Sequence, residues 1–492
     1  MNAERKIRSV AIIGAGAAGA VTAAAFAAEK SYDRIQVYER RDSPGGTWIY
    51  DADPNPRPPL RPGRLAPDID PPLDKPSALP ATLEPNRQER WTQTPIYNSL
   101  TTNVPEIAMS FSDFRFPCGP FVPHWVAKQY IENYFSAHKT DALLTLNTTL
   151  EDLTRLPGET WRLTLRKHDP LQQVDHWWEE TFDAVVLATG HYSVPFVPHV
   201  DGLDDYIKAF PDRVFHSKYY RNPAPFTGKR TLVIGNSASG HDVTAELVKT
   251  AQLPVYQSRR SRSRWDGDKP PAGIEWKPII KSFLPSGRIL FTDGSFLDDI
   301  DTIIYCTGYQ PSFPFWNTKA NGQPLWDYSA KKLVKSYWHG FFRDLPTFGI
   351  VGIPRTLTFR SFEYQAIAFA RLWAGRAAER LPSREEQIEW EKQRDENSRR
   401  DRTKFHDVPW DDGQTYEYLG RLFRIAGLGT LRGEGRVPPP LSDELVWAVE
   451  HVKKYPEPSK DSNRESEEVL GEEESEGWLL VEHAKKDSLG FI

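Results

Sequence analysis

Gly14-Ala15-Gly16-Ala17-Ala18-Gly19 has the pattern G-x-G-x-x-G and lies between two segments of different character. Residues 7–13, before it, are apolar and rich in Ile and Val, which predicts a buried strand. Residues 17–29 are rich in Ala, the strongest helix former, which predicts a helix. A further apolar run, residues 35–38, ends at Glu39. Strand, glycine turn, helix, strand and acidic residue in this order are typical of a dinucleotide-binding βαβ unit.

Each glycine of this turn has its own physical reason. The first permits the tight turn, the second lets the backbone approach a pyrophosphate, and the third lets the helix pack closely on the strand. The pyrophosphate would lie at the N-terminus of the helix, where backbone N–H groups are free. Glu39 would accept hydrogen bonds from ribose hydroxyls and would repel a 2′-phosphate. This unit is therefore predicted to hold FAD or NAD.

A second unit of the same kind lies farther along the chain. Gly235-Asn236-Ser237-Ala238-Ser239-Gly240 stands between predicted strands at residues 231–234 and 255–258, with Ser237 in place of the middle glycine. The second strand ends in Ser258-Arg259-Arg260, and no carboxylate stands at the ribose position. Because Arg can pair bidentately with a phosphate, this unit is predicted to hold NADP. The predicted contacts are Gly235, Ser237, Ser239, Gly240, Ser258 and Arg259.

Two dinucleotide units in one chain indicate electron transfer between a nicotinamide and a flavin. A disulfide reductase would need a redox pair of cysteines, but the chain holds only Cys118 and Cys306. The two cysteines also provide no four-cysteine metal site, and no metal is predicted. Quinones, other proteins and dioxygen remain as electron acceptors.

Composition limits the partners. The 62 Lys and Arg against 67 Asp and Glu give a net charge of -5, and no basic stripe points to nucleic acid. Residues 10–28 are uncharged, but the first glycine turn explains them better than a membrane span does. The segment before that turn is too short for a signal peptide, so secretion is not expected. The sequence predicts a cytoplasmic enzyme with no transmembrane segment, acting on a small molecule, and leaves a homodimer open.

The order of the segments predicts an α/β fold with two Rossmann-like dinucleotide-binding domains, the NADP domain inserted into the FAD domain. Residues 161–166 and 181–188 predict a hairpin and a return strand, residues 300–306 a strand, and residues 382–402 a helix. Residues 51–85 are rich in Pro and predict an irregular surface loop. The predicted parts are residues 1–192 (FAD domain, first part), 193–309 (NADP domain), 310–456 (FAD domain, second part) and 457–492 (disordered acidic tail).

Several further segments resemble one family. Gly45-Gly46-Thr47-Trp48 is similar to the G-G-x-W segment of class B flavoprotein monooxygenases, which are the flavin-containing monooxygenases and their Baeyer-Villiger relatives. Residues 97–105, YNSLTTNVP, resemble the family's Y-x-x-L-x-T-N-x-P block. Residues 188–190 and 306–309 resemble its A-T-G linkers, and residues 362–365 its F-E-x-Q segment. The resemblance spans residues 7–425 and is strongest to the soluble fungal members.

The family's identifier, F-x-G-x-x-x-H-x-x-x-[Y/F/W], resembles residues 210–220, FPDRVFHSKYY. Phe210, His216 and Tyr220 keep the spacing, whereas Asp212 replaces the glycine. The resemblance implies that His216 orients a hinge and is neither an acid nor a base. Thr307 and Gly308 of the second linker are assigned to the same hinge.

The resemblance also implies roles near the flavin. Thr47 and Trp48 would contact FAD, with the first glycine turn and Glu39. Asn103 would be the catalytic residue at the oxygen-reacting face, and Thr102 and Asn103 would also contact NADP.

The implied reaction uses NADPH to reduce FAD and transfers one oxygen atom of O2 from a C4a-hydroperoxyflavin to a small molecule. Baeyer-Villiger enzymes typically carry Pro after the aromatic residue of the identifier, whereas Arg221 follows Tyr220 here. This favours oxygenation of an amine nitrogen or of a thiol or thioether sulfur. Baeyer-Villiger oxygenation of a ketone stays an alternative, as does a redox-sensing interaction protein that binds both nucleotides. The sequence does not identify the substrate.

Overall fold

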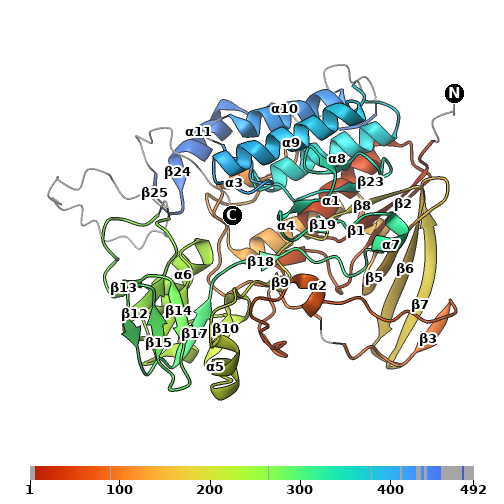
Figure 1. The fold of residues 1–492 in the computed structure, drawn as a ribbon. Helices are drawn as coiled ribbons and strands as arrows, with labels where there is room; N and C mark the ends of the chain where they lie inside the picture. The colour runs from red at the N-terminus through yellow and green to blue at the C-terminus, as the bar shows by residue number, and fades with distance from the viewer. Residues whose placement is uncertain are drawn as a thin grey trace.

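Two sheets form the framework of the computed structural model, one parallel throughout and one parallel except at one edge (Figure 1). The structure describes residues 6–88, 90–263, 265–377, 379–410, 413–427, 434–436, 440–455 and 479–480. The predicted disordered tail, 457–492, lies outside the described residues except for β25 (Leu479–Leu480).

The first sheet has the order β21-β22-β23-β8-β1-β2-β4. At its centre, β1 pairs in parallel with β2 and β8, and β8 pairs in parallel with β23. Its strands are β1 (Ser9–Ile13), β2 (Arg34–Tyr38), β4 (Leu144–Thr145), β8 (Ala184–Leu187), β21 (Ser336–Tyr337), β22 (Phe341–Phe342) and β23 (Phe348–Ile350). The chain thus leaves this sheet after β8 and returns to it at β21.

The second sheet is built from the intervening chain and has the order β10-β17-β11-β12-β13, all in parallel. Its strands are β10 (Val214–His216), β11 (Arg230–Ile234), β12 (Gln252–Ser258), β13 (Ile274–Lys277) and β17 (Thr302–Tyr305). Helix α6 (Ala238–Leu247) follows β11, as the second glycine turn predicts. The predicted fold class, with one dinucleotide fold inserted into the other, is confirmed, while the exact domain boundaries stay a prediction.

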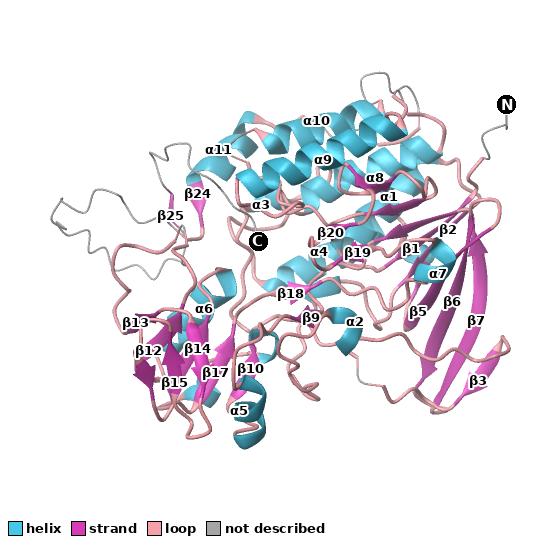
Figure 2. Ribbon diagram, viewed as in Figure 1, coloured by secondary structure: helices cyan, strands magenta, loops and turns pink. Residues whose placement is uncertain are grey.

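The first sheet is the middle of three layers, because β1 is apolar on both faces. Val10 and Ile12 belong to the core beneath the helices, whereas Ala11 and Ile13 belong to the core shared with an antiparallel sheet. Side chains of a strand alternate between faces, so one short strand serves both cores. Figure 2 shows the helical layer on one face. It includes α1 (Ala17–Glu29), α4 (His124–Ala137), α8 (Phe359–Trp373), α9 (Arg384–Arg400) and α10 (Gln414–Ala426).

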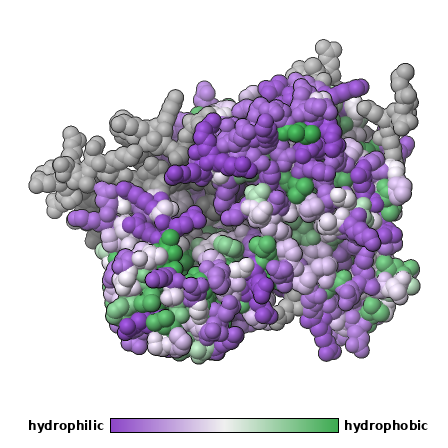
Figure 3. Space-filling view, in the orientation of Figure 1, coloured by the Kyte–Doolittle hydropathy of each residue, from purple (hydrophilic) through white to green (hydrophobic). Residues whose placement is uncertain are grey.

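The antiparallel sheet has the order β3-β7-β6-β5 and contains the predicted hairpin. Its strands are β3 (Ala81–Leu83), β5 (Thr148–Leu156), β6 (Thr160–Asp169) and β7 (Val174–Phe182). The predicted charged helix is α9, which begins after Ser383 with a capping box to Glu386. Its outer face belongs to a predominantly hydrophilic surface (Figure 3). Among the described helices, none is both long and apolar enough to cross a bilayer.

Candidate functional site

A cavity of about 1850 Å³ lies where the two parallel sheets face each other, and its wall includes residues from both glycine turns. Ligands of open parallel sheets bind outside the carboxyl ends of the strands, which is where both turns lie. A pocket for a single small molecule usually measures about 300–1,000 Å³. This cavity therefore has room for more than one ligand of ordinary size.

The first glycine turn is too crowded for side chains. Gly14 has φ +108°, and a Cβ there would lie 2.5 Å from the carbonyl oxygen of Ala188. A Cβ on Gly19 would lie 1.9 Å from the carbonyl oxygen of Gly14. Gly16 faces Gly46, whose Cα would be 3.3 Å from an added Cβ. The turn therefore packs on the 188–190 linker and on the 45–48 segment, leaving its N–H groups close to the cavity.

The second turn repeats this construction. Gly235 has φ +114°, and a Cβ there would lie 2.5 Å from the carbonyl oxygen of Cys306. A Cβ on Gly240 would lie 2.2 Å from the carbonyl oxygen of Gly235. Each turn thus packs on the backbone just before a Thr-Gly pair, at residues 189–190 and 307–308. The two units are equivalent in backbone packing despite the change at Ser237.

Glu39 is held at the end of β2 by the first turn. Its Oε2 accepts the N–H of Ala15 at 2.7 Å, and its Oε1 accepts the N–H of Arg41 at 2.9 Å. A carboxylate has about four acceptor positions, so two bonds leave capacity for a ligand. Glu39 lines the cavity, which suits its predicted role toward ribose hydroxyls.

Asn103 and Thr102 differ in their position relative to the cavity, because only Asn103 belongs to its wall. The Thr102 hydroxyl accepts the N–H of Val122 at 3.0 Å, and the N–H of Thr102 donates to the carbonyl of Val122 at 2.8 Å. Thr102 is buried and outside the cavity wall, so its hydroxyl fixes the loop. This position does not favour the predicted contact between Thr102 and NADP. Asn103 lines the cavity, and no hydrogen bond joins its amide to the described residues.

The predicted phosphate-binding arginine also points elsewhere. Nη1 of Arg259 lies 3.0 Å from Oδ2 of Asp266, and its guanidinium lies 3.4 Å from the ring centre of Trp276. Ser258 and Arg260 line the cavity, whereas Arg259 does not. Arg259 follows the last residue of β12, and its contacts with Asp266 and Trp276 hold its side chain away from the cavity. The geometry favours Arg260, which the sequence reasoning passed over.

Replacing Arg260 with Ala should weaken binding of NADPH by about 1–3 kcal/mol, since a charge-assisted pair to the phosphate is lost, and should leave NADH binding unchanged. Arg259→Ala is the matched control and should change the NADPH preference less. Titration of each nucleotide into the purified variants measures both effects. A larger loss for Arg259→Ala would return the phosphate contact to that residue.

The two connections between the sheets run side by side. β9 (Val194–Pro195) pairs with β18 (Tyr309–Gln310), and the N–H of Phe196 donates to the carbonyl of Gly308 at 2.8 Å. The His216 ring lies against the Tyr309 ring, with the ring centres 5.1 Å apart and an angle of 72° between the ring planes. Burial lowers the pKa of His216 to about 3, with Lys218 adding repulsion, so the ring is neutral. A neutral ring outside the cavity wall suits a hinge contact and argues against an acid or base.

The other residues of the identifier, like His216, make contacts within the protein and lie outside the cavity wall. The Tyr220 hydroxyl donates to Oε2 of Glu246 at 2.5 Å, and Phe210 packs under the guanidinium of Arg213 at 4.1 Å. Asp212 is exposed and its φ is not positive, so this turn does not require the family's glycine. Arg221 donates to the carbonyls of Lys218 and Tyr220, each at 2.9 Å. The identifier therefore fixes the backbone that enters the second sheet.

The predicted site residues divide into two sets. Those that line the cavity are Gly14, Gly16, Ala17, Ala18, Glu39, Thr47, Trp48, Asn103, Gly235, Ser237, Ser239, Ser258, Thr307 and Gly308. Those outside its wall are Ala15, Gly19, Thr102, Gly240, Arg259, Phe210, His216 and Tyr220. The second set supports the first through backbone packing and hydrogen bonds.

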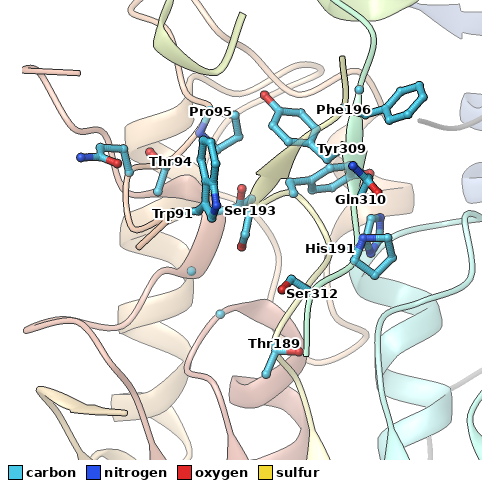
Figure 4. Close-up of a pocket in the computed structure, with 18 of the residues that line it drawn as sticks. Trp91, Thr94, Pro95, Thr189, His191, Ser193, Phe196, Tyr309, Gln310 and Ser312 are labelled. Atoms are coloured by element: carbon cyan, nitrogen blue, oxygen red, sulfur yellow. The ribbon is translucent and has the colours of Figure 1, made fainter. Parts of the chain in front are cut away.

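Sequence reasoning missed two further parts of the wall. Asp51, Asn55 and Asp70 from the Pro-rich segment line the cavity, so this irregular loop contributes to the site, a role that the sequence left open. His191 directly follows the first A-T-G linker, and its position after that motif was the available signal. Figure 4 shows Trp91, Thr94 and Pro95 on one side of the view and His191, Tyr309 and Gln310 on the other.

The orphaned polar atoms of the wall fit a large polar ligand. The Thr189 hydroxyl and both ring nitrogens of His191 are buried without a hydrogen-bond partner among the described residues. Burial lowers the pKa of His191 to about 4, with the charges of Arg355 and Lys404 nearby, so the ring is neutral and can both donate and accept. With the two crowded glycine turns, this wall fits a pair of dinucleotides.

Comparison with known proteins gives consistent matches. The family described as flavin-binding monooxygenase-like matches residues 85–265 and 272–427, and the NAD(P)-binding Rossmann-like domain matches residues 12–65. Flavin-containing monooxygenase FMO GS-OX5 of Arabidopsis thaliana is 32% identical over 457 residues, covering 90% of this chain and 84% of that protein. Flavin-containing monooxygenase iboF of Amanita muscaria (strain Koide BX008) is 30% identical over 431 residues, covering 75% of this chain and 79% of that protein.

Solved structures agree on the fold. S-allyl-L-cysteine S-oxygenase from Allium sativum has a TM-score of 0.71 and 26% identity, covering 90% of this chain and 92% of that chain. A caprolactone-bound cyclohexanone monooxygenase has a TM-score of 0.58 at 14% identity, covering 86% of this chain and 98% of that chain. At 14% identity, the likeness to cyclohexanone monooxygenase shows only that the two proteins share a fold.

Proposed function

Because this chain belongs to the flavin-binding monooxygenase-like family, we propose that it transfers one oxygen atom of O2 to a soft nucleophile, an amine nitrogen or a thiol or thioether sulfur, of a small molecule. The family resemblance predicted from the motifs is confirmed. The chain is an oxidoreductase, a monooxygenase that uses FAD and NADPH. One observation carries the proposal: both dinucleotide turns open into the same cavity.

The residues of the wall suggest how the two nucleotides are held. The first glycine turn, Glu39, Thr47 and Trp48 would hold FAD, and the second turn with Ser258 and Arg260 would hold NADP. The bound flavin supplies hydride acceptance from NADPH and the activation of O2. The chain's own part is to orient both nucleotides in one cavity and to limit the access of water.

Two groups of side chains would act on the reacting region. The Asn103 amide can donate and accept hydrogen bonds there without changing charge. Trp48, Phe359 and Phe362 give the wall an apolar part, and Trp48 meets Phe359 edge to face at 6.3 Å. A polar amide beside apolar rings can orient a reactive oxygen group while excluding water.

The choice of a soft nucleophile is supported by two observations. Arg221 takes the place of the Pro that follows the identifier in Baeyer-Villiger enzymes, and its guanidinium is fully engaged with carbonyl oxygens. The Allium sativum structure, which covers 90% of this chain, is named for oxygenation at sulfur. The cyclohexanone monooxygenase structure is similar in fold alone.

A product assay tests the proposal. The purified chain with FAD, NADPH and O2 is incubated separately with a dialkyl sulfide, a tertiary amine and a cyclic ketone. We expect a sulfoxide or an N-oxide, and no product without NADPH. An ester or lactone from the ketone, with the sulfide and amine unchanged, would contradict the proposal and favour the Baeyer-Villiger alternative.

Two finer points stay predictions. A cytoplasmic location is testable by fractionation of cells that express the chain. A homodimer is testable by sedimentation of the purified protein, where a single species of one chain's mass would rule it out.

A further inference from the structure

Two carboxylates of helix α6 face the first dinucleotide fold. Asp242 and Glu246 are four residues apart, so they lie on one face of the helix. Asp242 accepts a hydrogen bond from the Tyr97 hydroxyl, and Glu246 accepts one from the Ser99 hydroxyl. Tyr97 and Ser99 belong to the 97–105 block of the first fold. The helix of the second glycine unit therefore holds this block directly.

The segment after the last helix reaches the same carboxylate. Helix α11 (Asp443–His451) is followed by β24 (Val452–Lys453), which leads from the helical layer toward α6 (Figure 1). The Tyr455 hydroxyl donates to Oδ1 of Asp242 at 2.5 Å, and Nζ of Lys454 lies 3.4 Å from Oδ2. Asp242 thus receives donors from two separate parts of the chain outside the second fold.

Lys454 and Tyr455 each have a further contact. The Tyr455 ring packs against the rings of His241 and Trp265, with ring centres 4.9 Å and 5.1 Å apart, and both partners belong to the second fold. Nζ of Lys454 donates to the carbonyl of Thr101 at 3.3 Å, in the 97–105 block. These two residues therefore connect the block to the second fold.

The charge of Asp242 suits this junction. An ionised carboxylate accepts at both oxygens, and both are used here, Oδ1 by Tyr455 and Oδ2 by Tyr97 and Lys454. Burial raises the pKa of Tyr97, and the charge of Asp242 adds to the shift, so the hydroxyl stays protonated and donates. An amide in place of the carboxylate would offer one acceptor oxygen instead of two.

The junction lies in the wall of the cavity. Asp242, Tyr97 and Lys454 all line it, as Asn103 does. Between Tyr97 and Asn103 the loop is anchored by the Lys454 contact and by the hydrogen bonds of Thr102. The position of Asn103 relative to the second glycine turn therefore depends on the bonds that Asp242 accepts.

We propose that Asp242 is a positioning residue for the oxygenation reaction, which holds the 97–105 block and the Lys454-Tyr455 segment on α6 so that Asn103 keeps its place relative to the NADP unit. The inference rests on the proposed function, which gives the Asn103 amide its role. Asp242 lies little more than one turn beyond the N-cap Ser237, at the end of α6 where the pyrophosphate would bind. Its negative charge does not attract NADP, so it acts through Asn103.

Asp242→Asn keeps the size of the side chain but removes the charge and one acceptor. In the FAD-loaded chain with NADP, hydrogen–deuterium exchange of the amides of residues 98–102 should become about tenfold faster, because the block is held less firmly on α6. Affinity for NADP should not fall, since a negative charge near the pyrophosphate is removed. With a dialkyl sulfide as substrate, the ratio of sulfoxide to hydrogen peroxide should fall about tenfold.

Tyr97→Phe removes the donor of the same bond and should give the same changes. The double variant should change the product ratio little more than either single variant, because both changes act on one bond. Asp204→Asn on α5 (Leu203–Ala209) and Tyr416→Phe on α10 are the matched controls, since both residues are exposed and outside the cavity wall. Both controls should equal the unchanged protein. Thermal unfolding and flavin content establish that each variant is folded.

Two results would overturn the inference. One is unchanged amide exchange of the 97–105 block in Asp242→Asn. The other is faster exchange with an unchanged ratio of sulfoxide to peroxide, which would make Asp242 a residue of the fold alone. Because amide exchange needs no oxygenated product, a failure of the proposed oxygenation in the unchanged protein is distinguished from a failure of Asp242 to hold the block.

Discussion

Gly19→Ala should yield a chain that is purified without flavin. The added Cβ would lie 1.9 Å from the carbonyl oxygen of Gly14, a backbone atom that cannot move without opening the turn. Opening the turn displaces the N–H groups that the pyrophosphate needs. Overpacking of this kind costs about 1–3 kcal/mol, which corresponds to an affinity loss of up to about 100-fold. Flavin absorbance per chain, after dialysis against FAD, measures the effect.

Gly240→Ala is the matching change in the second unit and should have the opposite selectivity. Its Cβ would lie 2.2 Å from the carbonyl oxygen of Gly235, so this variant should keep flavin but lose NADP binding. Gly420→Ala in α10 is the control, since its Cβ would meet only the Arg424 side chain, at 3.7 Å. If Gly240→Ala lost flavin while remaining folded, the assignment of the two turns would be wrong.

Asn103→Ala should separate NADPH consumption from oxygen transfer. Flavin and NADP should stay bound, because the glycine turns are untouched, and Thr102 should still anchor the loop through Val122. The lost amide bond near the oxygen-reacting region should lower oxygenated product per NADPH about tenfold and raise hydrogen peroxide correspondingly. Product, NADPH and peroxide are measured in one reaction.

Asn98→Ala is the control for that change, because Asn98 lies in the same sequence block but is exposed and outside the cavity wall. Its coupling should equal that of the unchanged protein. Normal coupling in Asn103→Ala would remove Asn103 from the reacting region.

Both glycine turns could be predicted because the constraint is local. A φ of +108° at Gly14 or +114° at Gly235, with a backbone oxygen where a side chain would be, admits only glycine. The insertion could be predicted from the order of the segments, since a second strand and helix interrupt the first unit. These features depend on neighbours in sequence.

The choice between Arg259 and Arg260 could not be made from the sequence. Ser258 and Arg259 were predicted to contact the same ligand, but Arg259 lies beyond the end of β12 and its guanidinium contacts Asp266 and Trp276. Thr102 and Asn103 also divide into one residue that anchors the loop and one that lines the cavity, but that division depends on Val122, which lies 20 residues away.

The rest of the site could not be predicted from one sequence. Lys331 and Lys404 belong to loops that reach the cavity only through the packing of the returning chain, and neither loop carries a repeating pattern. The same holds for the contact between His216 and Tyr309, which depends on the pairing of β9 with β18. Such contacts are set by tertiary structure.

Simultaneous binding of FAD and NADP to one chain is the decisive property of the proposed site. Equilibrium dialysis of the purified chain with labelled FAD and labelled NADP, each at saturation, counts both ligands in the same sample. We expect one FAD and one NADP per chain, with neither displacing the other. Competition of the two nucleotides for a single site would contradict it.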